Sequence, residues 1–430
     1  MGHPSGPGHG IVVDAFSTGM KLAARLGAAG QPLLHVRSAA ALPGFLTRSY
    51  DPAAFDAEVV HAGDLDATCA RIATLTEGAP PRFIAVGTET GVALTDALAA
   101  RYGLPGNDPA TSAARRDKVT MAAHLERAGV AAPATFRAQS MDAALAWVAG
   151  HDRWPVVLKP AASAGNDKVF FCADLVEVRR AFAQIHGQEN RLGLQDAAVV
   201  VQAYLAGRQY IVNTASLDGR HCVTDIWADH RLPQRGASNI YDYEDLLPST
   251  GEVEDALTAY VGQALDALGV RHGPAHSEVM MTAAGPVLIE TAARLQGGLL
   301  DAPLAMALDR TQMAMAEACY TDPARFVALA AAPYRRRAYL RCVDLIAHRG
   351  GIVKAVPGLE LAGELPSFAG AVGWPAPGAR VVPTVDLLSA PGIAYLCHPE
   401  RDQIERDYHR IRALEAQGEF FIVEDPHAAS

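Results

Sequence analysis

The hydrophobic and polar positions of the first hundred residues predict strands that alternate with helices. Residues 10–16 (GIVVDAF) are an apolar run typical of a buried strand, and residues 17–30 (STGMKLAARLGAAG) follow with helical spacing. Residues 32–38 (PLLHVRS) predict a second strand, and residues 82–107 repeat the strand–turn–helix pattern. This alternation predicts an α/β domain with a parallel sheet that is covered on both faces.

The remaining chain combines helices with hairpins. Asp108 caps a helix that begins at Pro109 and ends near Gly129, and residues 400–418 form one charged helix. Between them lie β-type runs and Pro/Gly turns, without an internal repeat or a low-complexity linker. We therefore expect lobes around a shared cleft. They are an N-terminal α/β substrate domain (1–110), a central subdomain with a lid (111–205) and a C-terminal α+β lobe (206–430) that includes an accessory subdomain (335–430).

Composition limits the class of partner. The 430 residues carry a net charge of −10, and no block of Lys or Arg indicates a nucleic-acid or acidic-lipid surface. No apolar run approaches the ~20 residues of a membrane helix, and the opening MGHPSGPGHG lacks the features of a signal peptide. The six cysteines form no C-x-x-C pair, which is typical of free thiols in a reducing compartment. We expect a cytoplasmic protein without nucleic-acid or membrane partners. The sequence does not determine the oligomeric state, and a homodimer is one alternative.

Residues 154–171 (WPVVLKPAASAGNDKVFF) place a lysine where an apolar strand ends. Lys159 is one of only five lysines among 37 basic residues, which suggests that a compact ammonium group is needed here. The small residues that follow would let backbone N–H groups approach a phosphate closely. No G-K-[ST] occurs, so this is not a Walker A loop. This stretch alone fits a phosphate site and, equally well, a solvated loop with Lys159 reaching water.

Two glutamates are predicted to face each other on a late hairpin. Residues 276–290 (HSEVMMTAAGPVLIE) contain two β-type runs around a Gly-Pro turn. If the loop centres on Ala284, Glu278 and Glu290 lie opposite each other, ~5 Å apart, where like charges are destabilising. A Mg²⁺ ion bridged to nucleotide phosphates would offset that repulsion. The alternative is a one-residue bulge that shifts the register and leaves both carboxylates in water.

Arg294 and two glycines follow this hairpin. An arginine here would hold a substrate carboxylate or neutralise a transferring phosphoryl group, and the alternative is a simple ion pair with Glu290. Gly297 and Gly298 would let substrate or backbone approach closely.

Other polar residues have open roles. His276 shares a strand face with Glu278 and is either a base or a hydrogen-bonded structural histidine. Asp225 and Trp227 alternate with apolar positions, so they lie on a cleft or on an ordinary strand face. Lys168 is either a further phosphate contact or a surface charge.

Four segments, taken in order, resemble the ATP-grasp superfamily. They are RRDKVTMAAHLERAGV, VVLKPAASAG, VVVQAYLAGRQYIV and HSEVMMTAAGPVLIETAARLQGG. The tail, with GGIVKAVPGLELAGELPS and PGARVVPTVDLLSAPGIAYLCHPERDQIERDYHRI, is similar to the L-amino-acid ligases of that superfamily, as is the N-terminal VGTETGVALTDALAARYGLPGN. The resemblance implies an ATP-grasp fold with a Rossmann-like N-terminal domain, a central lid subdomain and a C-terminal α+β lobe.

The same resemblance implies roles for individual residues. Those implied to bind ATP are Lys118, Lys159, Ser163, Gly165, Gln202, Ala203, Tyr204, Leu205 and Gln209. Glu278 and Glu290 are implied to bind Mg²⁺, with Mn²⁺ as an alternative. The implied substrate contacts are Glu89, which would meet an ammonium group, Arg294, Gly297 and Gly298. The implied catalytic residues are Arg294, Lys159 and Ser163.

The chain departs from the superfamily at three positions. Gln202 and Gln209 stand where acidic residues are usual, although an amide still hydrogen-bonds a ribose hydroxyl. The usual E-x-N metal pattern is here Glu290, Thr291 and Ala292, so one metal contact is missing and a two-ion arrangement is in question.

These features together predict an ATP-dependent ligase. It would join the carboxylate of one amino acid to the amine of another through an acyl phosphate, with release of ADP and phosphate, in the synthesis of small peptides or antibiotics. Such chemistry depends on positioning and charge neutralisation, in keeping with the absence of G-x-S-x-G and H-E-x-x-H. The alternatives are an ATP-grasp enzyme of primary metabolism that acts on another carboxylate or on bicarbonate, a non-catalytic ATP-binding protein, and a nicotinamide-dependent oxidoreductase. The missing G-x-G-x-x-G counts against the last of these.

Overall fold

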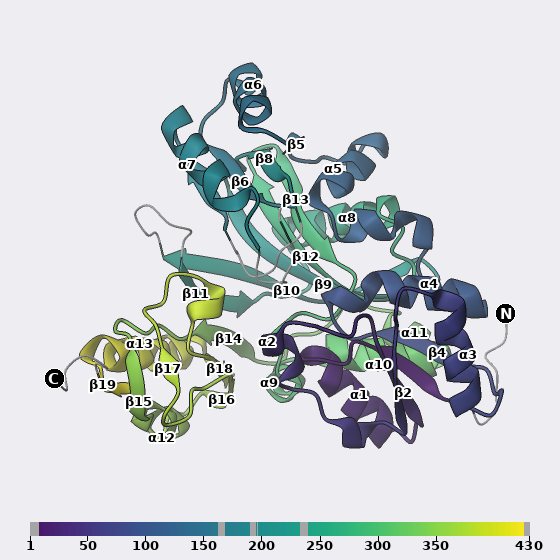
Figure 1. Ribbon diagram of the computed structural model, residues 1–430. Coiled ribbons are helices and arrows are strands. Elements are labelled where there is room, and N and C mark those ends of the chain that lie inside the picture. The colour runs from purple at the N-terminus through teal and green to yellow at the C-terminus, as the bar shows by residue number, and fades with distance from the viewer. Residues whose placement is uncertain (1–7, 162–167, 190–194, 196, 233–239, 425–430) are drawn as a thin grey trace.

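The computed structural model describes residues 8–161, 168–189, 195, 197–232 and 240–424. The chain forms three lobes, seen in Figure 1 as the purple N-terminal domain, the teal central subdomain and the green-to-yellow C-terminal lobe. No helix in the described part has both the length and the apolar character that a membrane span requires. All six cysteines are buried and unpaired, which confirms the prediction of free thiols.

The N-terminal domain is built on a four-stranded parallel sheet. Its strands β1 (Gly10–Val13), β2 (Leu33–Arg37), β3 (Ala57–Val60) and β4 (Phe83–Val86) stand in the order β3-β2-β1-β4. The helices are α1 (Thr18–Ala28), α2 (Gly44–Thr47), α3 (Leu65–Leu75) and α4 (Val92–Tyr102), with the 3₁₀ turns η1 (Pro52–Ala54) and η2 (Glu89–Gly91). The predicted α/β domain with a parallel sheet is therefore confirmed.

The central subdomain has an antiparallel sheet of its own. The turn η3 (Pro109–Arg115) and helix α5 (Lys118–Arg127) lead into strands β5 (Thr135–Ala138), β6 (Val156–Pro160), β7 (Phe170–Cys172) and β8 (Val199–Ala203), ordered β5-β8-β6-β7. Helices α6 (Met141–His151) and α7 (Leu175–Ile185) pack on this sheet through Val148, Val178 and Phe182. Packing by these helices therefore fixes the end of strand β6, where Lys159 and Pro160 lie.

The C-terminal lobe is organised by an eight-stranded antiparallel sheet in the order β13-β12-β9-β10-β11-β14-β18-β16. Its strands are β9 (Arg208–Leu217), β10 (Arg220–Leu232), β11 (Ile240–Leu246), β12 (Gly273–Thr282), β13 (Gly285–Ala292), β14 (Tyr339–Asp344), β16 (Phe368–Val372) and β18 (Ile393–His398). Since β14, β16 and β18 continue this sheet, these strands of the predicted accessory subdomain share a core layer with β9 to β13.

Helices and a small sheet complete this lobe. The helices are α8 (Glu252–Ala267), α9 (Asp301–Ala307), α10 (Gln312–Thr321), α11 (Pro323–Leu329), α12 (Pro357–Gly363) and α13 (Arg401–Gln417), with the 3₁₀ turn η4 (Leu387–Ser389). Strands β15 (Gly351–Ala355), β17 (Arg380–Val381) and β19 (Ile422–Glu424) form a separate three-stranded sheet.

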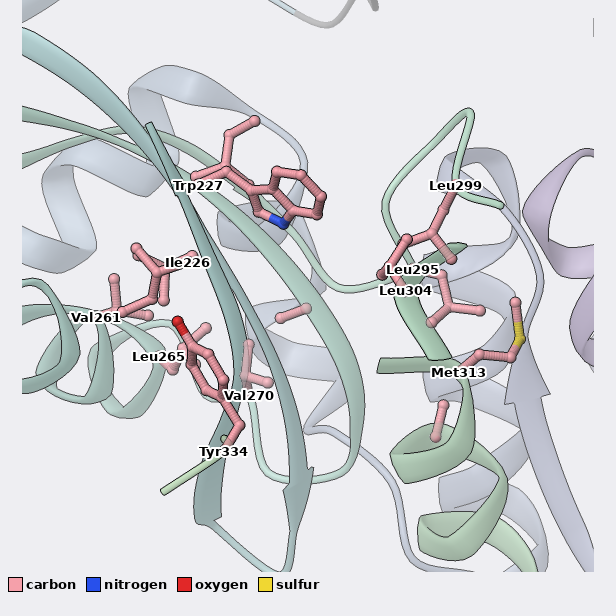
Figure 2. Close-up of a cluster of buried hydrophobic side chains, with 14 of the residues drawn as sticks. Ile226, Trp227, Val261, Leu265, Val270, Leu295, Leu299, Leu304, Met313 and Tyr334 are labelled. Carbon is pink, nitrogen blue, oxygen red and sulfur yellow. The ribbon is translucent and has the colours of Figure 1, made fainter. Parts of the chain in front are cut away.

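The large sheet is buried on both faces around β10. Neighbouring residues of a strand point to opposite faces. Figure 2 accordingly shows Ile226 on the side of Val261 and Leu265 of α8, and Trp227 on the side of Leu295 and Leu299. Burial on both faces explains the long apolar character of these strands. The face that carries Trp227 also carries the polar residues of the candidate site.

Candidate functional site

Two lysines and two glutamates from four different elements share one site. Lys118 is the first residue of α5, and its Nζ lies 2.7 Å from Oε2 of Glu290 on β13. Lys159 on β6 is only 5 % exposed. Glu278 on β12 lies directly opposite Glu290 in the hairpin. The structure therefore brings together the four groups that the sequence assigns to phosphate and metal binding.

The charges of these groups are strongly coupled. Burial, and next the neighbouring Lys118, lower the pKa of Lys159 from 10.5 to about 8, against the opposing effect of Glu290 and Glu278. Burial would raise the pKa of Glu290, but Lys118, Lys159 and Arg294 lower it from 4.5 to about 2. Burial lowers the pKa of Lys118, but Glu290 and nearby carboxylates outweigh it, so its pKa is raised. Glu290 is therefore an anion at every pH at which the protein would act.

Helix capping and a β-bulge position two of these groups. Asp117 is the N-cap of α5, where its carboxylate accepts from the Thr120 N–H at 2.8 Å, and this places Lys118 at the first helical turn. The hairpin turns at Ala283 and Ala284 rather than at the predicted Gly-Pro pair. The ladder pairs Glu278 with Glu290 but Val279 with Leu288, so Ile289 is the extra residue of a bulge. The predicted opposition of the glutamates is confirmed, and the bulge that was expected to break it is what produces it.

Glu278 is held by polar neighbours on its own sheet face. Gln209 on β9 donates from Nε2 to Oε2 of Glu278 at 2.9 Å, and Nε2 of His276 lies 3.8 Å from Oε1. Nδ1 of His276 is 2.9 Å from Oδ1 of Asn213, which supports a structural role for this histidine. An amide at position 209 suits this geometry because a carboxylate there would repel Glu278.

The carboxylate pair fits a divalent cation that is also bound by phosphate. Among the described residues, no group of three or more His, Cys, Asp or Glu is placed to hold a metal ion alone. Two opposed carboxylates with lysines beside them match the usual Mg²⁺ arrangement of one or two carboxylates plus phosphate oxygens. Ala292 lies opposite His276 at the position of the missing asparagine, so it adds no ligand.

Arg294 joins the N-terminal domain to this site. Its Nε lies 3.2 Å from Oε2 of Glu89 in η2, and Nε of Arg116 lies 3.8 Å from Oε1 of the same carboxylate. Glu89, and not Glu290, is therefore the ion-pair partner of Arg294, so the alternative of a simple Arg294–Glu290 pair is wrong. The contact brings two predicted substrate residues together from separate lobes.

The predicted adenine hinge lies between two sheets. Strand β8 ends at Ala203 in the central sheet, and the chain enters the large sheet with β9 at Arg208. Tyr204 is exposed and contacts Phe171 edge-on, with ring centroids 5.8 Å apart. The Gln202 side chain donates to Oγ1 of Thr135 at 2.9 Å.

Protein contacts therefore already use part of this hinge. The Ala203 N–H donates to the Ala134 carbonyl at 2.9 Å. An adenine base bound at this hinge would therefore contact residues that follow Ala203, among them the partly buried Leu205.

The two glycines have different environments. Gly298 has φ +68, and a Cβ there would lie 3.1 Å from Cδ1 of Ile393. Its carbonyl accepts from the Tyr395 hydroxyl at 3.1 Å. Gly298 is therefore required by the backbone. Gly297 has open space around its Cβ position.

Two predicted ATP-binding residues and one unassigned lysine remain. Ser163 and Gly165 lie outside the described residues, so their roles stay predictions. Lys168 donates from Nζ to the Glu189 carbonyl at 2.8 Å on the surface.

A buried polar network beneath the site was not predicted. Asn213 donates from Nδ2 to Oδ1 of Asp225 and to Oε1 of Gln296, both at 2.6 Å. Trp227 donates to the same Asp225 oxygen at 2.6 Å. Asp225 and Trp227 therefore belong to a packed network, as the ordinary strand-face interpretation implies. The only sequence signal for Asn213 was a polar residue inside an apolar strand.

Comparison with known proteins gives one family match and several whole-chain likenesses. The family described as "ATP-grasp domain" matches residues 152–302. Dapdiamide A synthase of Enterobacter agglomerans is 32 % identical over 413 residues, covering 94 % of this chain and 95 % of the relative.

Solved structures show the same fold at low identity. The L-amino acid ligase from Bacillus licheniformis aligns with a TM-score of 0.74 at 16 % identity, over 97 % of this chain and 99 % of that one. An ADP complex of N5-carboxyaminoimidazole ribonucleotide synthetase aligns with a TM-score of 0.67 at 14 % identity, over 97 % and 100 % of the chains.

Proposed function

Because this chain belongs to the ATP-grasp family of carboxylate–amine ligases, we propose that Lys118, Lys159, Glu278 and Glu290 bind one ATP with its divalent cation. The protein is an ATP-dependent ligase that forms amide bonds. The single observation that carries the site proposal is the 2.7 Å contact between Lys118 and Glu290, with Lys159 in the same electrostatic field. Lys118 comes from helix α5, Lys159 from the central sheet, and the two glutamates from the large sheet of the C-terminal lobe.

We infer that both substrates are amino acids and that the product is a dipeptide or a related amide. A carboxylate oxygen of the first substrate would attack the γ-phosphorus of ATP, and the bond from that phosphorus to ADP would break. The amine of the second substrate would then attack the acyl carbon, lose a proton and release inorganic phosphate. The name of the L-amino acid ligase and that of the dapdiamide synthase support an amide product.

The residues have separate tasks in this scheme. Lys118 and Lys159 would bind phosphate oxygens and neutralise charge as it moves to the leaving ADP. Arg294 would hold the substrate carboxylate and then the acyl phosphate, oriented by Glu89. Magnesium, or manganese in its place, would be held by Glu278 and Glu290 and would supply charge neutralisation at the phosphates.

A pairwise substrate screen tests this function. The protein is incubated with MgATP and every pair of proteinogenic amino acids, phosphate release is measured, and products are identified by mass. We expect ADP, phosphate and one amide per turnover for a subset of pairs. Phosphate release with bicarbonate as the only carboxylate would instead favour a carboxylase. ATP binding without turnover for every pair would favour a non-catalytic protein.

A further inference from the structure

A second group of acidic side chains lies on the same sheet face as Glu278, further from the hairpin. Asp229 on β10 and Glu244 on β11 are directly paired across the ladder. Glu244 also pairs with Cys342 on β14, and Asp344 lies two residues further on that strand, hence on the same face. We call Asp229, Glu244 and Asp344 the acidic cluster. Their exposed fractions are 7 %, 8 % and 3 %.

The protein compensates this cluster poorly. Asp229 receives the Arg231 guanidinium on Oδ2 at 2.8 Å. Within the described residues, the side chain of Glu244 receives a single hydrogen bond, at 3.4 Å from Nε2 of Gln296. In the described part of the chain, Oδ1 of Asp229 and Oδ1 of Asp344 are buried without any hydrogen-bond partner. Buried acceptors are normally paired, and unpaired buried carboxylates are costly. Among the described residues, Arg231 is the guanidinium that bonds a carboxylate of the cluster, while Arg412 donates to the backbone carbonyl of Asp344 at 2.8 Å. The carboxylates therefore lack a cationic hydrogen-bond donor for their unpartnered oxygens.

The missing group is better suited to nitrogen than to a metal ion. The acidic cluster is not placed to hold a metal, as the described residues contain no metal-binding group of three or more such side chains. A primary ammonium carries three N–H donors and can therefore satisfy separate oxygens, such as the unpartnered Oδ1 of Asp229 and an oxygen of Glu244, which is paired with Asp229 across the ladder. Hydrogen bonds from a charged donor to a carboxylate are also the strong class.

The position of the cluster identifies which ammonium group it would bind. Glu278 is in register with Ile211 on β9 and Trp227 on β10, so Asp229 lies two strands across and two residues along, roughly 12 Å from Glu278 between Cα atoms. An attacking amine must come within ~3.5 Å of the acyl carbon, so it cannot be the group held at the cluster while phosphate is held near Glu278. A side-chain ammonium several bonds away from the reacting centre has the required reach.

Gln296 connects the cluster to the candidate substrate loop. Its Nε2 donates to Glu244, its Oε1 accepts from Asn213 at 2.6 Å, and it directly precedes Gly297 and Gly298. The Thr18 hydroxyl, at the start of α1, donates to the Gln296 carbonyl at 2.8 Å. A substrate seated along this loop would extend from the metal carboxylates towards the cluster.

We propose that the acidic cluster binds the side-chain ammonium of a basic amino acid, so that one of the two substrates belongs to this class. The inference rests on the proposed function and narrows its substrates. Burial and mutual repulsion raise the pKa of Glu244, and burial and then Asp229 raise the pKa of Asp344 from 3.8 to about 7. A bound ammonium ion would offset the repulsion between these carboxylates.

The test compares substrates that differ only in the terminal ammonium group. Lysine is compared with norleucine, and ornithine with norvaline, each offered as either substrate with a common partner. We expect kcat/KM for the cationic member to be higher by about tenfold or more, the effect of one well-made ion pair. Asp344→Asn and Glu244→Gln should each remove most of this preference by lowering kcat/KM for the cationic member towards that of the neutral member.

A matched control separates selectivity from folding. Asp225 is a buried acid on the same face, but its oxygens accept from Asn213, Trp227 and Thr224, so Asp225→Asn should alter stability without altering the preference. If an Asp344 variant does not fold, the melting temperature of the wild-type protein is measured with each amino acid instead. The proposal then predicts that lysine raises the melting temperature more than norleucine does.

The outcomes separate failure of the acidic-cluster proposal from failure of the proposed ligase function. Turnover of neutral pairs with no preference for cationic ones, and no change in Asp344→Asn, would overturn the role of the acidic cluster alone. No amide product from any pair would count against the proposed function itself.

Discussion

The Nζ atom of Lys118 lies 2.7 Å from Oε2 of Glu290, so the first turn of α5 is joined to the hairpin β12–β13 through one ion pair. The lysine neutralises a carboxylate that we assign to a metal ion. Nucleotide binding would therefore exchange partners: the lysine would turn to phosphate and the carboxylate to the cation.

Lys118→Ala should weaken ATP binding. The variant removes a cation from the phosphate site and leaves Glu290 without its nearest positive charge. We expect KM for ATP to rise by about tenfold or more, the usual consequence of losing one charge-assisted hydrogen bond. Steady-state kinetics with varied ATP measures this. Lys168→Ala is the control, since that lysine is bound to a surface carbonyl and should leave KM for ATP unchanged.

The pH dependence of ATP binding should report on Lys159. Its pKa of about 8 means that the ligand-free protein holds this lysine charged below pH 8 and neutral above it. KM for ATP should therefore rise as the pH passes 8, because a neutral amine binds phosphate less well. Lys159→Arg should shift that rise to higher pH, since guanidinium stays charged. A flat profile in the wild-type protein would exclude this assignment.

The titration of Lys159 should also change the stability of the protein. We expect the free energy of unfolding to rise over the pH range in which ATP binding weakens. In the unfolded chain the pKa is near 10.5, so between pH 8 and 10.5 the folded state binds fewer protons at this position. The contribution of Lys159 to the free energy of unfolding therefore rises with pH in this window. Subtracting the unfolding curve of Lys159→Met from that of the wild-type protein isolates this contribution.

Glu290→Gln should abolish most turnover and leave the fold intact. The amide keeps the shape of the side chain but removes the charge that binds the cation, and loss of such an electrostatic group costs about 10²–10³ in kcat. Circular dichroism and the melting temperature check the fold. The variant should also be less sensitive to acid, because the wild-type Glu290, with a pKa near 2, contributes stability that is lost as pH falls from 4.5 through 2. Wild-type rates in this variant would remove Glu290 from the site.

Glu89→Gln should affect the amino-acid substrates and not ATP. Glu89 lies 3.2 Å from Nε of Arg294 and is also the residue proposed to meet a substrate ammonium group. Neutralising it releases Arg294 and removes that contact, so KM for one amino acid should rise by about tenfold. KM for ATP should stay within a factor of about two. An equal rise in both constants would indicate a general loss of structure instead.

The sequence predicts the local elements of this protein well because they depend on nearby residues. The parallel N-terminal sheet follows from the alternation of apolar strands and helices. The single helix expected from Pro109 to near Gly129 is instead the 3₁₀ turn η3 followed by α5, because Asp117 caps a second helical start. The facing of Glu278 and Glu290 was also predicted, but from an incorrect turn position. The bulge at Ile289 compensates for that error, and no local pattern marks it.

Contacts between residues far apart in the chain could not be predicted from the sequence. The pairing of Arg294 with Glu89 depends on how two lobes meet, which neither segment determines alone. The acidic cluster is assembled from β10, β11 and β14, more than a hundred residues apart at its extremes. Register between such strands is set by tertiary packing, so no local sequence pattern indicates that Asp229 and Asp344 belong to the same cluster.

The most direct test of the central claim is an anomalous diffraction measurement on crystals grown with Mn²⁺ and a non-hydrolysable ATP analogue. We predict one manganese peak bridging the Glu278 and Glu290 carboxylates and phosphate oxygens, with Lys118 and Lys159 in contact with the same triphosphate. A peak away from both glutamates, or a triphosphate that neither lysine reaches, would contradict the account.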